Sequence, residues 1–185
     1  MRTPFSLSCL LAALLLVAGA PAGASDVTDP DAPRSLPAEG PVSVQWTDPA
    51  QFTEIRQSRN RWEARRGDWV RKLAEYLRKQ AAARLPEGER LDVTITDIKR
   101  AGDFEPWQGM RTDHVRYMRD LYPPRIALDF TLTGADGQVL AQGSRDLTDL
   151  AYLHGRPRAP DNDPLRYDKQ LLDDWLRKEF DKPAG

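Results

Sequence analysis

Apolar residues occupy every second position in several short segments, which is the period of a strand with one buried face. The clearest examples are residues 42–46 (VSVQW) and 125–133 (RIALDFTLT). Residues 91–98 follow the same alternation until Ile98 falls out of phase, which predicts a bulge near Thr96–Asp97.

A hairpin is predicted after the second of these strands. Asp136–Gly137 is a dipeptide typical of tight hairpin turns. Residues 138–147 (QVLAQGSRDL) are therefore expected to return beside residues 125–133 as the partner strand.

Apolar residues three to four positions apart predict two helices. Asn60 and Glu63 fit a capping box that opens a long helix of about 25 residues, and Pro86 ends it. Asp163–Pro164 fits the start of a shorter helix. The apolar side of the long helix comprises Trp69, Leu73, Leu77, Ala81 and Leu85, with Trp62 and Val70 beside it, and that of the short helix comprises Leu165, Leu172, Trp175, Leu176 and Phe180.

These elements predict an α+β fold with the order β-α-β-β-β-α. Helices with one apolar stripe and strands with one apolar face imply two layers. We expect a mainly antiparallel sheet of about four strands, with the long and the shorter helix packed on one of its faces. Residues 112–122 fit a helix and a strand almost equally, and their conformation stays open.

The N-terminal region predicts export. Residues 1–24 combine Arg2, an apolar run from Leu7 to Ala18 and a small-x-small site at Ala22–Ala24, which is typical of a cleavable signal peptide. Residues 25–41 are rich in Pro, Asp and Ala and predict a disordered tether, followed by a single domain over 42–182. We therefore expect a periplasmic protein with no transmembrane segment in its mature chain.

Composition narrows the classes of function. The formal net charge is −1, which does not favour steering toward nucleic acid or acidic membranes. The single cysteine, Cys9, lies in the predicted signal peptide, so no disulfide framework is expected. The basic residues of 59–85 keep one alternative open, binding of a polyanion, although a solvated helix face accounts for them as well.

No motif for catalysis or for a cofactor is present. His114 and His154 have no neighbouring ligand pattern, so we expect no metal site, and no glycine-rich phosphate loop occurs. Two of the many carboxylates could still form an acid/base pair, as in a small hydrolase acting on envelope glycan. That hydrolase is the second alternative.

The loop AGDFEPWQG, residues 101–109, is the main candidate site. It places Phe104 and Trp107 beside Asp103 and Glu105, a composition suited to gripping a ligand or partner, and equally to a lid over the end of the sheet. Arg125, directly after two prolines, is a further candidate, although the first exposed residue of a strand needs no function.

Four blocks of the sequence together resemble domain of unknown function family 3016 (DUF3016). They are VSVQWTDPAQFTEIR, LPEGERLDVTITDIKRAG, YPPRIALDFTL and DPLRYDKQLLDDWLRKEF, in this order. The resemblance covers residues 42–180 and implies a small exported protein of Gram-negative bacteria. It implies no substrate, cofactor or catalytic residue. The sequence thus predicts a periplasmic binding or protein-interaction module without catalysis, whose partner is an envelope protein or a small ligand.

Overall fold

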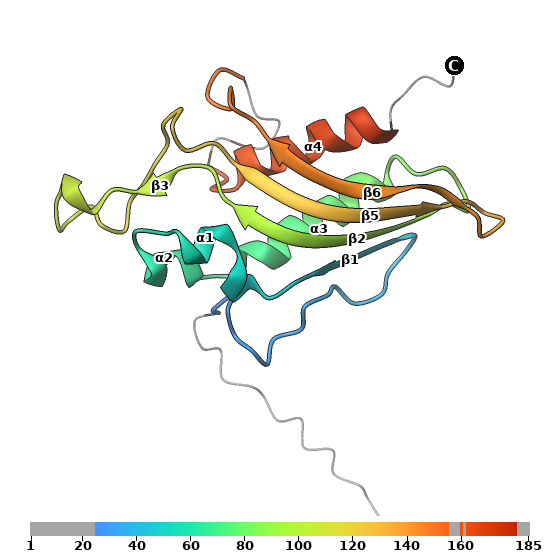
Figure 1. Cartoon of the computed structure of the whole chain (residues 1–185), viewed down its shortest axis with the longest axis horizontal. Coiled ribbons are helices and arrows are strands. Elements are labelled where there is room, and N and C mark those ends of the chain that lie inside the picture. The colour runs from blue at the N-terminus through green and yellow to red at the C-terminus, as the bar shows by residue number, and fades with distance from the viewer. Residues whose placement is uncertain (1–24, 156–159, 161, 181–185) are drawn as a thin grey trace, which may run out of the picture.

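The structure is a computed structural model that describes residues 25–155, 160 and 162–180 (Figure 1). Its centre is a four-stranded sheet with the order β1-β2-β5-β6. The strands are β1 (Val42–Trp46), β2 (Arg90–Lys99), β5 (Arg125–Thr133) and β6 (Val139–Thr148). β1 runs parallel to β2, whereas β2, β5 and β6 are antiparallel neighbours.

The helices differ in length and in role. The two long helices, α3 (Trp69–Ala82) and α4 (Arg166–Phe180), lie side by side behind the sheet in Figure 1. The short helices α1 (Thr53–Arg56) and α2 (Arg61–Arg65) and the 3₁₀ turn η1 (Pro49–Gln51) connect β1 to α3. The predicted α+β fold, with two helices on a mainly antiparallel sheet, is confirmed.

The core lies between the sheet and these two helices, as the apolar patterns predict. Alternate residues of β2 and β5, such as Val93 and Phe130, are buried against α3 and α4. Trp175 of α4 packs edge-on against Phe130, with ring centroids 5.8 Å apart. Polar residues on the same strands point to the open face of the sheet.

Two local predictions are confirmed. The register of β2 against β5 shifts between Ile95 and Asp97, at the predicted bulge. β5 and β6 form the predicted hairpin, with Gly137 at a φ of 82° in the turn, a conformation that glycine adopts without strain.

The predicted helix of about 25 residues is wrong, because the chain breaks after α2. Arg66 is extended and Gly67 has a φ of 89°, in the left-handed region. Glycine adopts this conformation readily and ends helices, so α3 starts anew at Trp69. Trp62, expected beside the core stripe, is exposed as a consequence.

The predicted tether is also corrected, because residues 25–37 lie on the domain; we call this segment the strap. The Leu36 N–H donates to the Val44 carbonyl at 3.0 Å, and the Trp46 N–H donates to the Arg34 carbonyl at 2.9 Å. Leu36 is buried in the main core. Composition missed these contacts because the strap pairs through its backbone along the edge of β1 and buries few side chains.

The end of the chain that was predicted to be a signal peptide, residues 1–24, lies outside the described residues. The last residues of the predicted domain, Asp181 and Lys182, lie outside them too. Among the helices that the structure describes, none combines the length and apolar character needed to cross a membrane.

Candidate functional site

Residues 101–122, which we call the arm, leave the sheet after β2 and return just before β5 (Figure 1). The arm contains β3 (Asp103–Phe104), the 3₁₀ turn η2 (Pro106–Gln108) and β4 (Arg116–Tyr117), which pairs antiparallel with β3. The segment 112–122, which sequence left open, is therefore mostly irregular with one short strand.

The base of the arm closes at Gly102. Its φ is 75°, and its N–H donates to the Tyr122 carbonyl at 2.9 Å. A side-chain carbon at this position would lie 2.8 Å from the Tyr117 carbonyl oxygen, so the two halves of the arm can meet only at a glycine.

The bulge in β2 positions α1 next to the arm. Asp97, at the bulge, accepts the Thr53 backbone N–H and the Thr53 hydroxyl, both at 2.6 Å. These bonds fix the first turn of α1. The next residue, Glu54, then points into the base of the arm.

Glu54 is 1% exposed and is surrounded by three cationic side chains. The Arg100 N–H and guanidinium each donate to its carboxylate at 3.0 Å, and the Lys99 ammonium lies at 3.4 Å. Arg116, from β4, donates to the same carboxylate. Glu54 therefore joins α1, the end of β2 and the returning half of the arm at one point.

Two of these cations also stack on aromatic rings. The Arg100 guanidinium lies 4.5 Å from the ring centroid of Trp69, and that of Arg116 lies 4.5 Å from the ring of Phe104. Such stacking holds a guanidinium in place while it bonds an acid.

Asp168, from α4, is the second buried carboxylate at this point and is also 1% exposed. One of its oxygens accepts the Ala101 N–H at 3.0 Å. The other, Oδ2, has no hydrogen-bond partner among the described residues. The base of the arm is thus attached to α4 as well as to α1.

The pKa values of these two acids move in opposite directions. Burial raises the pKa of Glu54, but Arg116, Arg100 and Lys99 outweigh it and lower that pKa to about 2. Burial raises the pKa of Asp168 to about 6, because the Ala101 N–H and the more distant Arg100 and Arg116 compensate only in part. Glu54 stays ionised at neutral pH, whereas Asp168 takes up a proton in mildly acidic solution.

A second set of ion pairs holds the outer part of the arm. Burial raises the pKa of Glu105, but hydrogen bonds from Arg119, Gln108 and Tyr122 outweigh it, so the pKa is lowered. The Arg119 Nε lies 2.7 Å from the Glu105 carboxylate. Asp103, buried as well, accepts a bond of 2.7 Å from Arg59 in the connection between α1 and α2.

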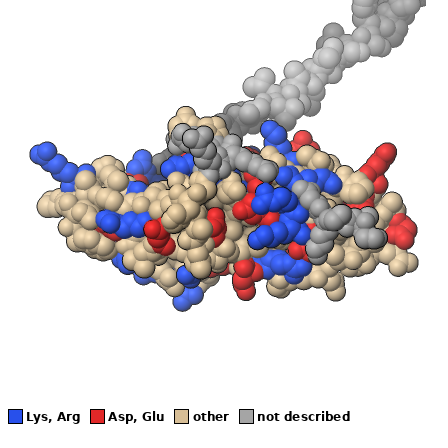
Figure 2. Space-filling model, turned by 90° about the horizontal axis from the view of Figure 1, so that it is seen from above, with Lys and Arg blue, Asp and Glu red and all other residues tan. Residues whose placement is uncertain are grey.

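The tip of the arm, in contrast, is exposed and apolar. Trp107 is 62% exposed and Met110 is 94% exposed. The guanidinium of Arg59 lies 5.2 Å from the centroid of the Trp107 ring, which supports the ring from the side of the domain. The Asn60 amide donates to the Asp113 carbonyl at 2.9 Å and ties the tip to α2. The arm projects to the left in Figure 1, and the left end of the molecule in Figure 2, which is turned about the horizontal axis, shows isolated charges between uncharged residues.

The structure separates the five candidate residues from the sequence into three groups. Asp103, Phe104 and Glu105 are buried and hold the arm together. Of the five, only Trp107 is exposed at the tip of the arm. Arg125 begins β5 between Lys99 and Thr148, on the open face of the sheet, and is not part of the arm.

Sequence reasoning missed Glu54 and Asp168. A signal for each was present: Glu54 lies between the apolar residues Phe52 and Ile55, and Asp168 falls three residues after Leu165 on the apolar side of α4. An acid on an apolar stripe predicts a buried ion pair or a functional group.

Neither histidine joins this site. His114 lies 3.5 Å from Asp113 and His154 lies 4.0 Å from Asp120, both on the surface. Within the described part of the chain, no three His, Cys, Asp or Glu side chains are placed together so that they could hold a metal ion.

Comparison with known proteins places the chain in a family. The profile of a family described as "Protein of unknown function (DUF3016)" matches residues 40–178. The chain belongs to the DUF3016 family. The match includes the arm, Glu54 and Asp168, and it begins after the strap. A search of curated proteins found no match.

Proposed function

We propose that this DUF3016 protein is an interaction module without catalysis that binds a partner protein through the tip of its arm. The supporting observation is the position of its exposed apolar residues. Of the eight large apolar side chains that are exposed in the described part of the chain, six lie at the arm end of the sheet. These six are Trp62, Trp107, Met110, Val115, Leu121 and Leu150.

The placement of these six follows from their elements. Four of them belong to the arm itself, and Trp62 belongs to α2, which Asn60 ties to the arm. Leu150 follows Thr148, whose partner Arg125 starts β5 where the arm ends. The remaining two, Val139 and Leu140, lie at the opposite end of the sheet, near the hairpin turn.

The chemistry of this surface suits a protein partner. Tryptophan and arginine dominate the binding energy of many protein interfaces, and Trp107 with Arg59 offers both side by side. Exposed apolar groups that gather at one place mark interaction sites. Because buried ion pairs fix the arm before binding, little conformational entropy is lost when a partner docks.

The proposed location is the periplasm. It rests on the pattern of residues 1–24, with Arg2, the apolar run and the small-residue cleavage site. The proposed partner is accordingly an envelope protein.

The two alternatives have weaker support. Glu54 and Asp168 have the divided pKa values that acid/base pairs use, but each is 1% exposed, so a glycan could not contact either. Several cations of α2 and α3 are engaged by acids, including Arg71 with Glu75 at 2.8 Å and Lys72 with Asp68 at 2.7 Å. A polyanion would have to compete with those pairs.

Site-specific photo-crosslinking in cells that export the protein tests the proposal. A photoreactive residue at Met110 should give a discrete adduct whose partner mass spectrometry identifies. The same residue at Asp136, in the hairpin turn at the opposite end, is the matched control and should give none. With the purified partner, Trp107→Ala should weaken binding by about tenfold or more, as expected for an interface anchor. Equal adducts from both positions, or unchanged affinity of the Trp107 variant, would reject the proposal.

A further inference from the structure

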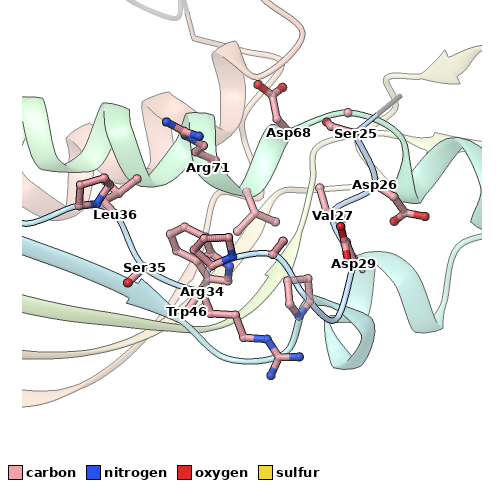
Figure 3. Close-up of a pocket in the computed structure, with 16 residues that line it drawn as sticks. Ser25, Asp26, Val27, Asp29, Arg34, Ser35, Leu36, Trp46, Asp68 and Arg71 are labelled. Carbon is pink, nitrogen blue, oxygen red and sulfur yellow. The ribbon is translucent and has the colours of Figure 1, made fainter. Parts of the chain in front are cut away.

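A second candidate site lies away from the tip of the arm. A cavity of about 350 Å³ opens between the strap, the end of β1 and the first turn of α3 (Figure 3). Its apolar lining includes Val27, Leu36, Trp46 and Val70. Cavities of this size and character are typical of sites for small molecules.

The outer wall of this cavity is fixed at both ends of the strap. At one end, the Gly67 N–H donates to the Ser25 carbonyl at 2.7 Å, and the Val27 N–H donates to the Arg65 carbonyl at 3.0 Å. At the other end, the backbone of Arg34 and Leu36 pairs with β1. The strap therefore bridges from the turn before α3 to the edge strand, with the cavity beneath its middle part.

The middle of the strap is ordered by its own turns. The carboxylate of Asp26 accepts the Thr28 N–H at 2.8 Å, and that of Asp29 accepts the Asp31 N–H at 2.9 Å. These short-range bonds shape the strap without a ligand. A preformed wall lowers the entropic cost of binding.

Most charged groups around the cavity already have partners. Arg34 lies 3.2 Å from Asp48, and Arg71 lies 2.8 Å from Glu75. Figure 3 shows these two arginines extending in opposite directions, away from Val27 and Trp46. The acids Asp26 and Asp68 are paired in the same way, with Arg65 and Lys72.

Asp29 is the exception among the charged groups that line this cavity. Within the described residues its carboxylate has no ion-pair partner and accepts one hydrogen bond, from the Asp31 N–H. The paired charges cancel, so Asp29 leaves the site with one net negative charge. An anionic ligand is disfavoured there, and a cationic one is favoured.

We propose that this cavity binds a small organic cation, with an apolar body against Val27, Leu36 and Trp46 and a protonated amine near Asp29. This inference is independent of the proposed function of the arm. Ten of the sixteen residues that line the cavity belong to the strap, which precedes the region matched by the family.

Three probes with the same apolar body test this inference: 2-phenylethylamine, 2-phenylethanol and phenylacetate. Each is titrated into the purified protein while ¹H–¹⁵N spectra record the Trp46 indole N–H and the amides of Val27 and Leu36. The amine should give saturable shifts at these positions and should bind about fivefold more tightly than the alcohol, as one partly exposed ion pair allows. Phenylacetate should bind most weakly.

Asp29→Asn removes the charge and keeps an oxygen that can accept the Asp31 N–H. It should bring the amine and the alcohol to equal affinity. Asp31→Asn, on the same strap but outside the cavity lining, is the matched control and should leave the preference unchanged. Ala32→Phe, which fills the cavity from the strap, should remove the shifts caused by all three probes.

Three results would overturn the inference. They are the absence of saturable shifts with the amine at millimolar concentration, phenylacetate binding as tightly as the amine, and an unchanged preference in the Asp29 variant. Variants of the arm, including Trp107→Ala, should not alter the titrations, so failure here is distinct from failure of the proposed function.

Discussion

The arm and the strap are both additions to the sheet and its two long helices, and different contacts hold each of them. The arm is attached through buried charges: Glu54 joins α1, β2 and β4, and Asp168 adds α4. The strap is attached through backbone hydrogen bonds at its two ends and through one buried side chain, Leu36.

The difference bears on what each segment can do. A buried charge strongly resists the loss of one of its partners, so the arm should remain in one orientation until the domain unfolds. A segment held by backbone bonds near solvent can open locally at lower cost. The arm is therefore suited to presenting a fixed surface, and the strap to admitting a small molecule.

Removal of the Glu54 charge should have the largest effect and should release the arm. In Glu54→Gln, Arg100, Arg116 and Lys99 lose their shared partner, and we expect the free energy of unfolding to fall by about 3 to 5 kcal/mol. Urea denaturation followed by fluorescence measures it. Glu75→Gln, which removes the exposed pair with Arg71, is the control and should cost below about 1 kcal/mol. If Glu54→Gln lowered the free energy of unfolding by less than about 1 kcal/mol, the ion pairs of Glu54 would not be what holds the arm.

Asp168 should make the stability of the native state, to which it attaches the arm, depend on pH. A carboxyl whose pKa is raised by folding stabilises the native state most below its unfolded pKa of 3.8, and that stability is lost as pH rises through about 6. The rise in pKa corresponds to about 3 kcal/mol.

The variant Asp168→Asn cannot ionise, so its free energy of unfolding should change less between pH 4 and pH 8 than that of the unmodified chain. Urea denaturation at several pH values tests this. The contribution of Glu54 runs the other way: its pKa is lowered, so its stability is lost below pH 4.5, toward about 2. If the free energy of unfolding changed equally between pH 4 and pH 8 in Asp168→Asn and in the unmodified chain, the role of Asp168 would be contradicted.

Leu36→Ala should weaken the strap and leave the arm in place. We expect the free energy of unfolding to fall by about 2 kcal/mol, because the side chain is buried at the edge of the core. Ser35→Ala, at an exposed neighbouring position, should change it little. Hydrogen exchange should accelerate at strap amides. At the Gly102 amide, which exchanges through global unfolding, the opening free energy should fall by no more than the free energy of unfolding itself. A larger fall at Gly102 than in the free energy of unfolding would mean that weakening the strap also loosens the arm.

Trp107→Ala should have the smallest effect on stability. The ring is largely exposed and contacts Arg59 at the surface, so we expect a change below about 1 kcal/mol. Thermal unfolding measures it. A loss of several kcal/mol would mean that Trp107 supports the fold, and the loss of partner binding in this variant would then have a structural cause.

The two-layer fold could be predicted because single faces carry the apolar residues. The alternation in residues 125–133 and the stripe from Trp69 to Ala81 each require burial on one side. The break at Gly67 was missed because the apolar spacing continues across it. The strap was missed because its attachment is mainly through the backbone, which leaves no side-chain pattern.

The candidate site was predictable only in part. Composition pointed to residues 103–107, yet it gave no means to distinguish the buried Asp103 and Glu105 from the displayed Trp107. The contacts that fix the arm join positions far apart in the sequence, such as Glu54 with Arg116 and Ala101 with Asp168. Pairings over such distances are set by the tertiary fold.

Native-state hydrogen exchange at two amides tests the central claim most directly. The Gly102 N–H, at the base of the arm, bonds the Tyr122 carbonyl, and the Leu36 N–H, in the strap, bonds the Val44 carbonyl. We predict that Gly102 exchanges only with an opening free energy close to that of global unfolding, whereas Leu36 exchanges through a cheaper local opening. Exchange at Gly102 as fast as at Leu36, or faster, would contradict the claim that buried charges hold the arm as a fixed surface.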